Sequence, residues 1–182
     1  MEIVSELLGA DHESLADLLR ELQLELQKHE LARSFKLLDL FWARLAVHIR
    51  AENLCLFPKL LNAPQKLYNE GRGVPSFEKV KTTIENLRAD HNFFMDELSS
   101  AVKTIRTIST ESESPQEVAR QLDTISERVV ALSERLIAHN VLEEDHVYTW
   151  PGLIFSIPEV ERLATEMKHE IENMPQRFAG PD

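Results

Sequence analysis

Apolar residues recur every three or four positions along four long stretches of this chain, and this spacing constrains the fold more than any other feature. The first stretch covers residues 11–28 and the second covers residues 31–56, whereas the third begins at Ser76 and the fourth at Pro115. This period is that of an α-helix with one buried face, and no stretch alternates as a strand does. We therefore expect an all-α protein, an up-down-up-down four-helix bundle with an additional C-terminal helix.

The ends of these helices can also be predicted. A short amphipathic lead, residues 2–9, precedes the first helix, and Asp11 is expected to cap that helix. Pro58 should end or kink the second helix, since proline cannot donate a backbone hydrogen bond. The longest connection is expected over residues 62–75, and the additional helix over about residues 158–173.

The length of the chain, 182 residues, is that of one domain with an appendage. We expect the bundle to occupy residues 1–150. Residues 151–182 should form a C-terminal extension whose helix packs on or beside the bundle.

Composition limits the possible cellular locations and binding partners of the protein. The formal net charge of −11 argues against nucleic acid or an anionic membrane as a partner. Cys55 is the single cysteine, which excludes an internal disulfide and fits a reducing compartment. The first residues are acidic where a signal peptide would be basic, and no apolar run approaches the ~20 residues that span a bilayer. These features predict a cytoplasmic protein.

Two of the apolar helix faces carry a histidine and a glutamate four residues apart. These pairs are His48 with Glu52 and His139 with Glu143. Residues at positions i and i+4 lie on the same side of a helix, so each pair presents an imidazole and a carboxylate in one direction. A metal ion requires ligands arranged in this way.

The chain also repeats itself weakly. His12 recurs as His91, 79 residues later, and each follows an aspartate; the pair His48–Glu52 recurs as His139–Glu143, 91 residues later. Each half thus consists of a helix with one histidine and then a helix with the His-x-x-x-Glu pair. This order suggests a pseudo-twofold site at the centre of the bundle.

A single histidine on an apolar face is usually a core residue, and a single glutamate beside it is usually solvated. Six such residues distributed alike over two halves are harder to explain without a metal, because buried charges need compensation. The expected ligands are His12, His48, Glu52, His91, His139 and Glu143. They can give each of two metal ions two imidazoles, with both carboxylates bridging ions about 3.5–4 Å apart. Imidazole and carboxylate donors without thiolate favour iron, with manganese possible.

Several neighbouring residues have more than one interpretation. Glu144 is rotated by about 100° from its neighbour, so Glu143 is preferred unless the helix distorts. His146 is expected at a helix end, with a gating or outer role as the alternative, and Cys55 is expected to be buried and inert. For Asp11 and Asp90 the alternative to a place near a helix start is a hydrogen bond to a ligand histidine.

Taken in order, these residues resemble the hemerythrin-like family, also called the HHE cation-binding domain. The match consists of His12, His48-x-x-x-Glu52 followed by Leu56-Phe57-Pro58, His91, and His139-x-x-x-Glu143, and it covers roughly residues 10–150. The resemblance implies an up-down-up-down bundle around a non-haem di-iron centre bridged by two carboxylates and an oxygen atom.

The sequence departs from the oxygen-carrying members of that family at two places. Those proteins have a second histidine four residues after the one on the third helix, where this chain has Met95. Their last carboxylate would correspond to Glu144 rather than Glu143. The pattern is similar to the more symmetric branch of bacterial proteins and a eukaryotic iron-sensing domain, in which both metals have open positions.

We therefore expect a di-iron protein that binds or senses oxygen, nitric oxide or iron. The alternative is a di-iron redox enzyme, either an oxidase or peroxidase or a protein that repairs nitric-oxide damage or iron centres. Binding is favoured because no acid–base group beyond the ligands is evident. A third interpretation is a structural helical module without metal, which uses the acidic tail helix to contact a partner.

Overall fold

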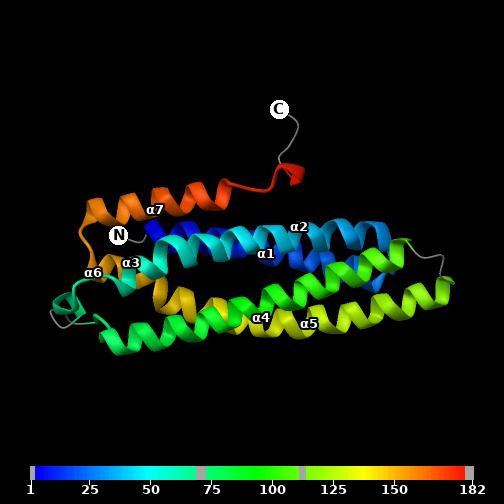
Figure 1. The fold of residues 1–182 in the computed structure, drawn as a ribbon, viewed down its shortest axis with the longest axis horizontal. Helices are drawn as coiled ribbons and strands as arrows, with labels where there is room; N and C mark the ends of the chain where they lie inside the picture. Colours follow the sequence, from blue (N-terminus) through cyan, green and yellow to red (C-terminus); the bar gives the residue numbers. More distant parts are fainter. Residues whose placement is uncertain (1–2, 69–72, 111–113, 179–182) are drawn as a thin grey trace.

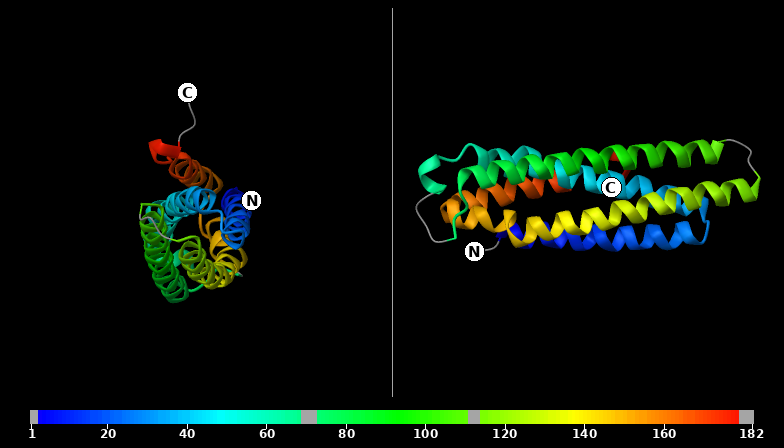
Figure 2. Two further views of the ribbon diagram at one scale, coloured as in Figure 1. Left: turned by 90° about the vertical axis from the view of Figure 1, so that its right-hand side faces the viewer. Right: turned by 90° about the horizontal axis from the view of Figure 1, so that it is seen from below.

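A computed structural model describes residues 3–68, 73–110 and 114–178 of the chain. All regular structure in these ranges is helical, which confirms the all-α class. The long helices are α1 (Ile3–Gln27), α2 (Leu31–Ala51), α4 (Phe77–Thr110) and α5 (Pro115–Asp145). They lie side by side along the long axis of the molecule (Figure 1), and the end-on view in Figure 2 shows them around a common centre. No helix in the described ranges is long and apolar enough to cross a membrane.

The first helix begins earlier than the sequence indicated. The lead expected over residues 2–9 is, from Ile3 onward, part of α1, and residue 2 lies outside the described ranges. Val4 and Leu8 are buried and extend the apolar face of α1 by two turns, so packing favours an unbroken helix. Asp11 therefore lies inside α1, and the prediction that it caps the helix is wrong.

Pro58 was expected to end or kink the second helix. Helix α2 ends before it, at Ala51, and the backbone stays helical through Pro58. It passes into a π-helical turn, η1 (Glu52–Leu56), and then into α3 (Phe57–Leu61). The backbone N–H of Phe57 bonds to the carbonyl of Glu52, five residues back. The wider turn relieves the clash that a proline ring makes with an α-helical carbonyl four residues before it. Such turns are frequent at functional sites, and this one begins at a predicted ligand.

The apolar core consists of two clusters at different heights along the bundle. One contains Leu15 and Phe94, together with the residues beyond them toward the turn between α1 and α2. The other contains Leu8, Leu87 and the short helices at the opposite end, α3 and α6 (Trp150–Ile154). His12 and His91 lie between these levels of α1 and α4, so the predicted site is closed by apolar side chains above and below.

The expected tail helix is present as α7 (Ile157–Glu172), outside the four long helices and against α1 and α2 (Figures 1 and 2). Arg50 of α2 anchors it: Nε donates to Glu170 Oε2 at 2.7 Å, and the guanidinium also donates to the carbonyl oxygens of Glu170 and Asn173. The buried residues of α7 share a cluster with α3 and α6. The division into units at residue 150 stays a prediction.

The predicted long connection contains a 3₁₀ turn, η2 (Gln65–Tyr68), and residues 69–72 of it lie outside the described ranges.

Candidate metal centre

All six predicted ligands are brought together in the middle of the bundle. The four long helices supply the histidines, Glu52 is the first residue of the π turn, and Glu143 lies in the last turn of α5. All six residues are buried, with at most 4% of their surface exposed. The helical spacing of each His-x-x-x-Glu pair aims both side chains inward, as the sequence indicated.

The imidazoles form two pairs. His12 Nε2 and His48 Nε2 are 3.1 Å apart, and His91 Nε2 and His139 Nε2 are 3.2 Å apart. Each pair forms with Glu143 a group of three donor atoms that lie within 4.8 Å of one another. The two histidine pairs thus share a carboxylate, as ligands of two neighbouring cations do.

Both carboxylates reach both histidine pairs. Glu52 Oε2 lies 3.2 Å from His91 Nε2 and 3.6 Å from His48 Nε2. Glu143 Oε1 lies 3.1 Å from His139 Nε2, and its Oε2 lies 3.5 Å from His12 Nε2. Each glutamate therefore lies within 3.6 Å of an imidazole nitrogen from both histidine pairs.

One oxygen of each glutamate forms no hydrogen bond with any residue that the structure describes. Glu52 Oε2 and Glu143 Oε1 are fully buried and lack a hydrogen-bond partner among the described residues. An unsatisfied buried carboxylate oxygen is costly, and a cation is the partner that satisfies it. The donor set of four imidazoles and two carboxylates fits iron or manganese.

Charge in the site is balanced between the carboxylates and the imidazoles. Burial and the neighbouring Glu143 oppose ionisation of Glu52, but His48 and His91 outweigh them and lower its pKa. Burial opposes protonation of His48, yet the carboxylates of Glu52 and Asp11 raise its pKa to about 10. Burial also opposes protonation of His91, but the carboxylates of Glu143 and Glu52 raise its pKa to about 9. Metal ligation needs neutral imidazoles, so a cation bound here would take the place of these protons.

Two aspartates orient the histidines of the His-x-x-x-Glu pairs. Asp11 Oδ2 lies 2.9 Å from His48 Nδ1, and Asp90 Oδ2 lies 3.2 Å from His139 Nδ1. Asp90, like Asp11, is inside a helix, so the alternative interpretation of both aspartates matches the structure. A carboxylate on Nδ1 turns the Nε2 lone pair toward the site.

Arginines extend this arrangement outward, and sequence reasoning missed them. Arg44 donates to Asp11 Oδ1 at 2.6 Å, and Arg135 donates through Nε to Asp90 Oδ1 at 2.9 Å. Arg135 follows Arg44 by 91 residues, the interval that separates the two His-x-x-x-Glu pairs. The repeat therefore includes a third layer of residues, and this interval was the signal that could have revealed it.

The other two histidines have unlike partners. Glu144 Oε1 lies 2.7 Å from His12 Nδ1, whereas the amide nitrogen of Asn53 lies 3.3 Å from His91 Nδ1. Glu144 is exposed, and it is Glu143 that points into the site. The two halves thus differ in charge behind one histidine.

Tyr148 is the main site residue that the sequence interpretation missed. Its hydroxyl donates to Glu52 Oε1 at 2.7 Å and lies 3.0 Å from both Glu143 Oε2 and His12 Nε2. In a continuous helix it would be rotated by about 140° from Glu143. However, α5 ends at Asp145, and the 3₁₀ turn η3 (Val147–Thr149) directs the ring back to the site. Burial, followed by the charges of Glu143 and Glu52, raises the pKa of the Tyr148 hydroxyl well above its ordinary value.

Aromatic rings close the site on the side of α4. Phe57 stacks on His91 with ring centres 5.7 Å apart, and Phe94 meets His139 edge-on at 5.2 Å. Met95 is half-buried and packs against the apolar cluster below the site. The two rings help to bury His91 and His139, which are 2% and 4% exposed.

Two further residues with open interpretations lie outside the cluster. His146 is exposed just after the last residue of α5, as expected of a helix-end histidine. Cys55 is half-buried rather than buried, and its free thiol lines a surface hollow together with Pro58 and Phe155. Burial, with the charges of Glu170 and Glu166, raises the pKa of this thiol.

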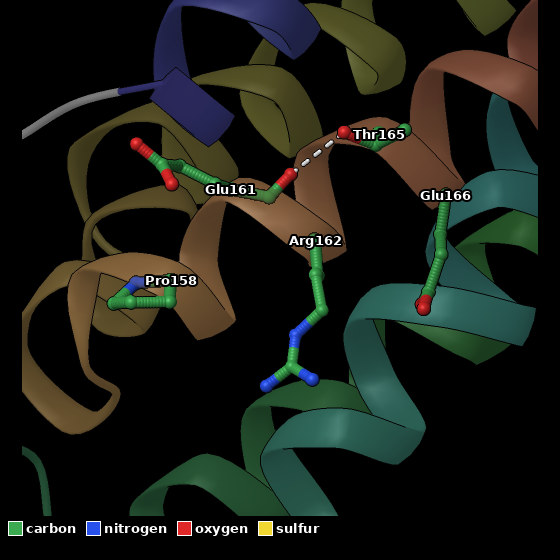
Figure 3. Close-up of a pocket in the computed structure, with 5 residues that line it drawn as sticks. All are labelled: Pro158, Glu161, Arg162, Thr165 and Glu166. Carbon is green, nitrogen blue, oxygen red and sulfur yellow. Dashed lines mark hydrogen bonds between the residues drawn. The ribbon is translucent and has the colours of Figure 1, made fainter.

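A second surface hollow lies on α7 and is shown in Figure 3. Arg162 of α7 lines it, and Thr165 donates a hydrogen bond to the carbonyl of Glu161 at 2.9 Å. None of the predicted ligands lines this hollow. The buried cluster, not the surface, is therefore where the chemistry-bearing residues gather.

Comparison with known proteins agrees with this geometry. The family model described as the hemerythrin HHE cation binding domain matches residues 4–151, which include every residue of the cluster. Neither the curated proteins nor the solved structures compared with the chain gave a match.

Proposed function

Because the chain belongs to the hemerythrin HHE cation-binding family, we propose that it is a non-haem di-iron protein that binds or senses oxygen, nitric oxide or iron. One observation carries the proposal: two histidine pairs share two buried glutamates, and each glutamate has an oxygen without a hydrogen bond in the part of the chain that the structure describes. We further propose that α1, α2, α4 and α5 run up-down-up-down, as in a hemerythrin-like bundle.

The residues have the following proposed roles. His12 and His48 bind one iron, His91 and His139 bind the other, and the two glutamates, Glu52 and Glu143, bridge them. Nitrogen and oxygen donors without thiolate support iron, with manganese as the alternative metal. When bound, iron supplies a site for a small ligand and the ability to change oxidation state.

The chain's own residues prepare the site for this role. Asp11 and Asp90 hold the imidazole rings in orientation, which preserves the Nε2 lone pairs for a cation. Phe57 and Phe94 keep water from the rings, and a dry site favours a small uncharged diatomic ligand over water. We also propose that the protein is located in the cytoplasm, because a single cysteine fits a reducing compartment.

Metal analysis tests the proposal. Protein produced with iron should contain close to two equivalents, and His48→Ala should lose most of that metal. His146→Ala is the matched control, because His146 is exposed and lies outside the cluster. Well under one equivalent in the unaltered protein would contradict the proposal. Unchanged iron content and thermal stability in His48→Ala would favour the structural module without metal.

A di-iron redox enzyme remains the second candidate, and the buried phenol of Tyr148 beside the carboxylates is the observation that favours it. Mixing the reduced, iron-loaded protein with oxygen distinguishes the two functions. Oxygen that can be removed again under vacuum supports binding. Oxygen that is consumed, with oxidation of both irons, supports the enzyme.

A further inference from the structure

The hydroxyl of Tyr148 lies where the donor groups of one half of the site converge. It is within 3.0 Å of one oxygen of each bridging glutamate and of His12 Nε2, and it is 3.4 Å from His48 Nε2. A phenol has a single proton, so it can donate to only one of the two carboxylates at a time. The crowding of acceptors around one hydroxyl is the arrangement expected of a group that shares a cation with them.

We propose that Tyr148 is a further metal ligand, which binds iron(III) through its phenolate oxygen in the half formed by His12 and His48. The proposal rests on the di-iron function proposed above. Ligation breaks the phenolic O–H bond, forms an O–Fe bond and releases the proton to water, and no electron is transferred. The iron(III) is supplied from solution as a ferric chelate.

The internal repeat supports this role, because it shows what the other half has instead. The residue 91 positions before Tyr148 is Phe57. Phe57 lies beside His91 with ring centres 5.7 Å apart, as Tyr148 lies beside His12 at 5.4 Å. The two rings therefore have equivalent places, and the hydroxyl is what distinguishes them. Among the described residues, Tyr148 adds a phenolic oxygen to one half of the site that the other half lacks.

The surroundings of the two halves agree with this difference. In the half with Tyr148, both histidines have carboxylates behind them, Glu144 on His12 and Asp11 on His48. In the other half, one of the two partners is the neutral amide of Asn53. A phenolate and an additional carboxylate stabilise the more positive ion, so the half-reduced protein should keep its iron(III) beside Tyr148.

The absorption spectrum of the iron(III)-loaded protein tests the proposal, since an iron-bound phenolate gives a visible charge-transfer band and enhanced ring modes in resonance Raman spectra. The chain has two tyrosines, so Tyr68→Phe is the matched control. Tyr68 is buried, and its hydroxyl donates to the carbonyl of Leu60 in another part of the fold. The band should be present in the unaltered protein and in Tyr68→Phe, and absent from Tyr148→Phe.

Metal content is measured on the same samples. Tyr148→Phe should bind iron(III) at least about 10-fold more weakly, the scale on which supporting groups of a metal site act. A converse variant, Phe57→Tyr, should intensify the band by adding a phenol to the other half. If Tyr148→Phe does not fold, the band in Tyr68→Phe alone assigns the ligand, because one tyrosine then remains.

Three results would overturn the inference. Unaltered protein with two equivalents of iron and no phenolate band would refute the ligand role and leave the di-iron function standing. A band that persists in Tyr148→Phe would do the same. Failure of the unaltered protein to bind iron would overturn the di-iron function and this inference together.

Discussion

Replacing Asp11 with asparagine should weaken metal binding without disturbing the fold. The carboxylate of Asp11 lies 2.9 Å from His48 Nδ1 and the residue is 8% exposed, so its charge acts on the imidazole with little screening by water. Asparagine keeps the size of the side chain but loses the charge. Loss of such a partner costs about 10–100-fold in metal affinity, which is about 1.4–2.8 kcal/mol.

The repeat supplies an internal comparison for this variant. Asp90 has the same role toward His139, but its contact is longer, 3.2 Å, and its side chain is 24% exposed. Asp90→Asn should therefore lose less affinity than Asp11→Asn. Asp17→Asn is the control, because Asp17 is on the same helix but exposed and pairs only with Arg20 among the described residues.

The assay is a titration of the metal-free variants with iron(II) under argon, in competition with a chromophoric chelator. Circular dichroism before titration verifies that each variant is helical. The expected order of lost affinity is Asp11→Asn, then Asp90→Asn, then Asp17→Asn with no loss. Equal affinities in all three variants would refute the reasoning, as would a larger loss in Asp90→Asn than in Asp11→Asn.

Three other outcomes are expected. The pKa values of His48 and His91 are raised to about 10 and about 9, so their protonated forms stabilise the metal-free protein fully below pH 6.5 and lose this effect as pH rises through 9–10. The urea midpoint of the metal-free protein should fall over that interval. A rise would contradict the raised pKa values. Phe41→Ala empties a fully buried position and should lower the free energy of unfolding by about 3–5 kcal/mol. The control Val130→Ala, on the exposed side of α5, should change that free energy by less than about 0.5 kcal/mol. Similar losses for both variants in urea unfolding would be inconsistent with this core. Arg50→Ala removes the three hydrogen bonds that anchor α7 and should speed amide hydrogen exchange in that helix while iron content stays the same; unchanged exchange would show that apolar packing alone retains α7.

The sequence by itself determined the helical class and singled out the residues that the structure gathers at the centre. Both conclusions depend on local geometry. A helix places positions i and i+4 on one side whatever surrounds it, so His48 with Glu52 and His139 with Glu143 had to point together. The order of the two halves then indicated that His12 and His91 would meet these pairs.

Only the tertiary structure decided what lies around that cluster. Aspartate is typical of helix caps, so Asp11 was expected at the start of the first helix. The apolar residues before it are buried, however, and α1 therefore begins eight residues earlier, at Ile3. Glu144 and Asn53 face histidines on other helices, and no local pattern reveals such contacts.

The same distinction explains Tyr148. Helical periodicity assigns it to a different direction from Glu143, and periodicity applies only while the helix continues. Where α5 ends and how the chain turns back depend on how the next helices, α6 and α7, pack against the start of α1, which is distant in sequence. The local period places the predicted ligands, and long-range packing at the end of the helix brings the phenol to them.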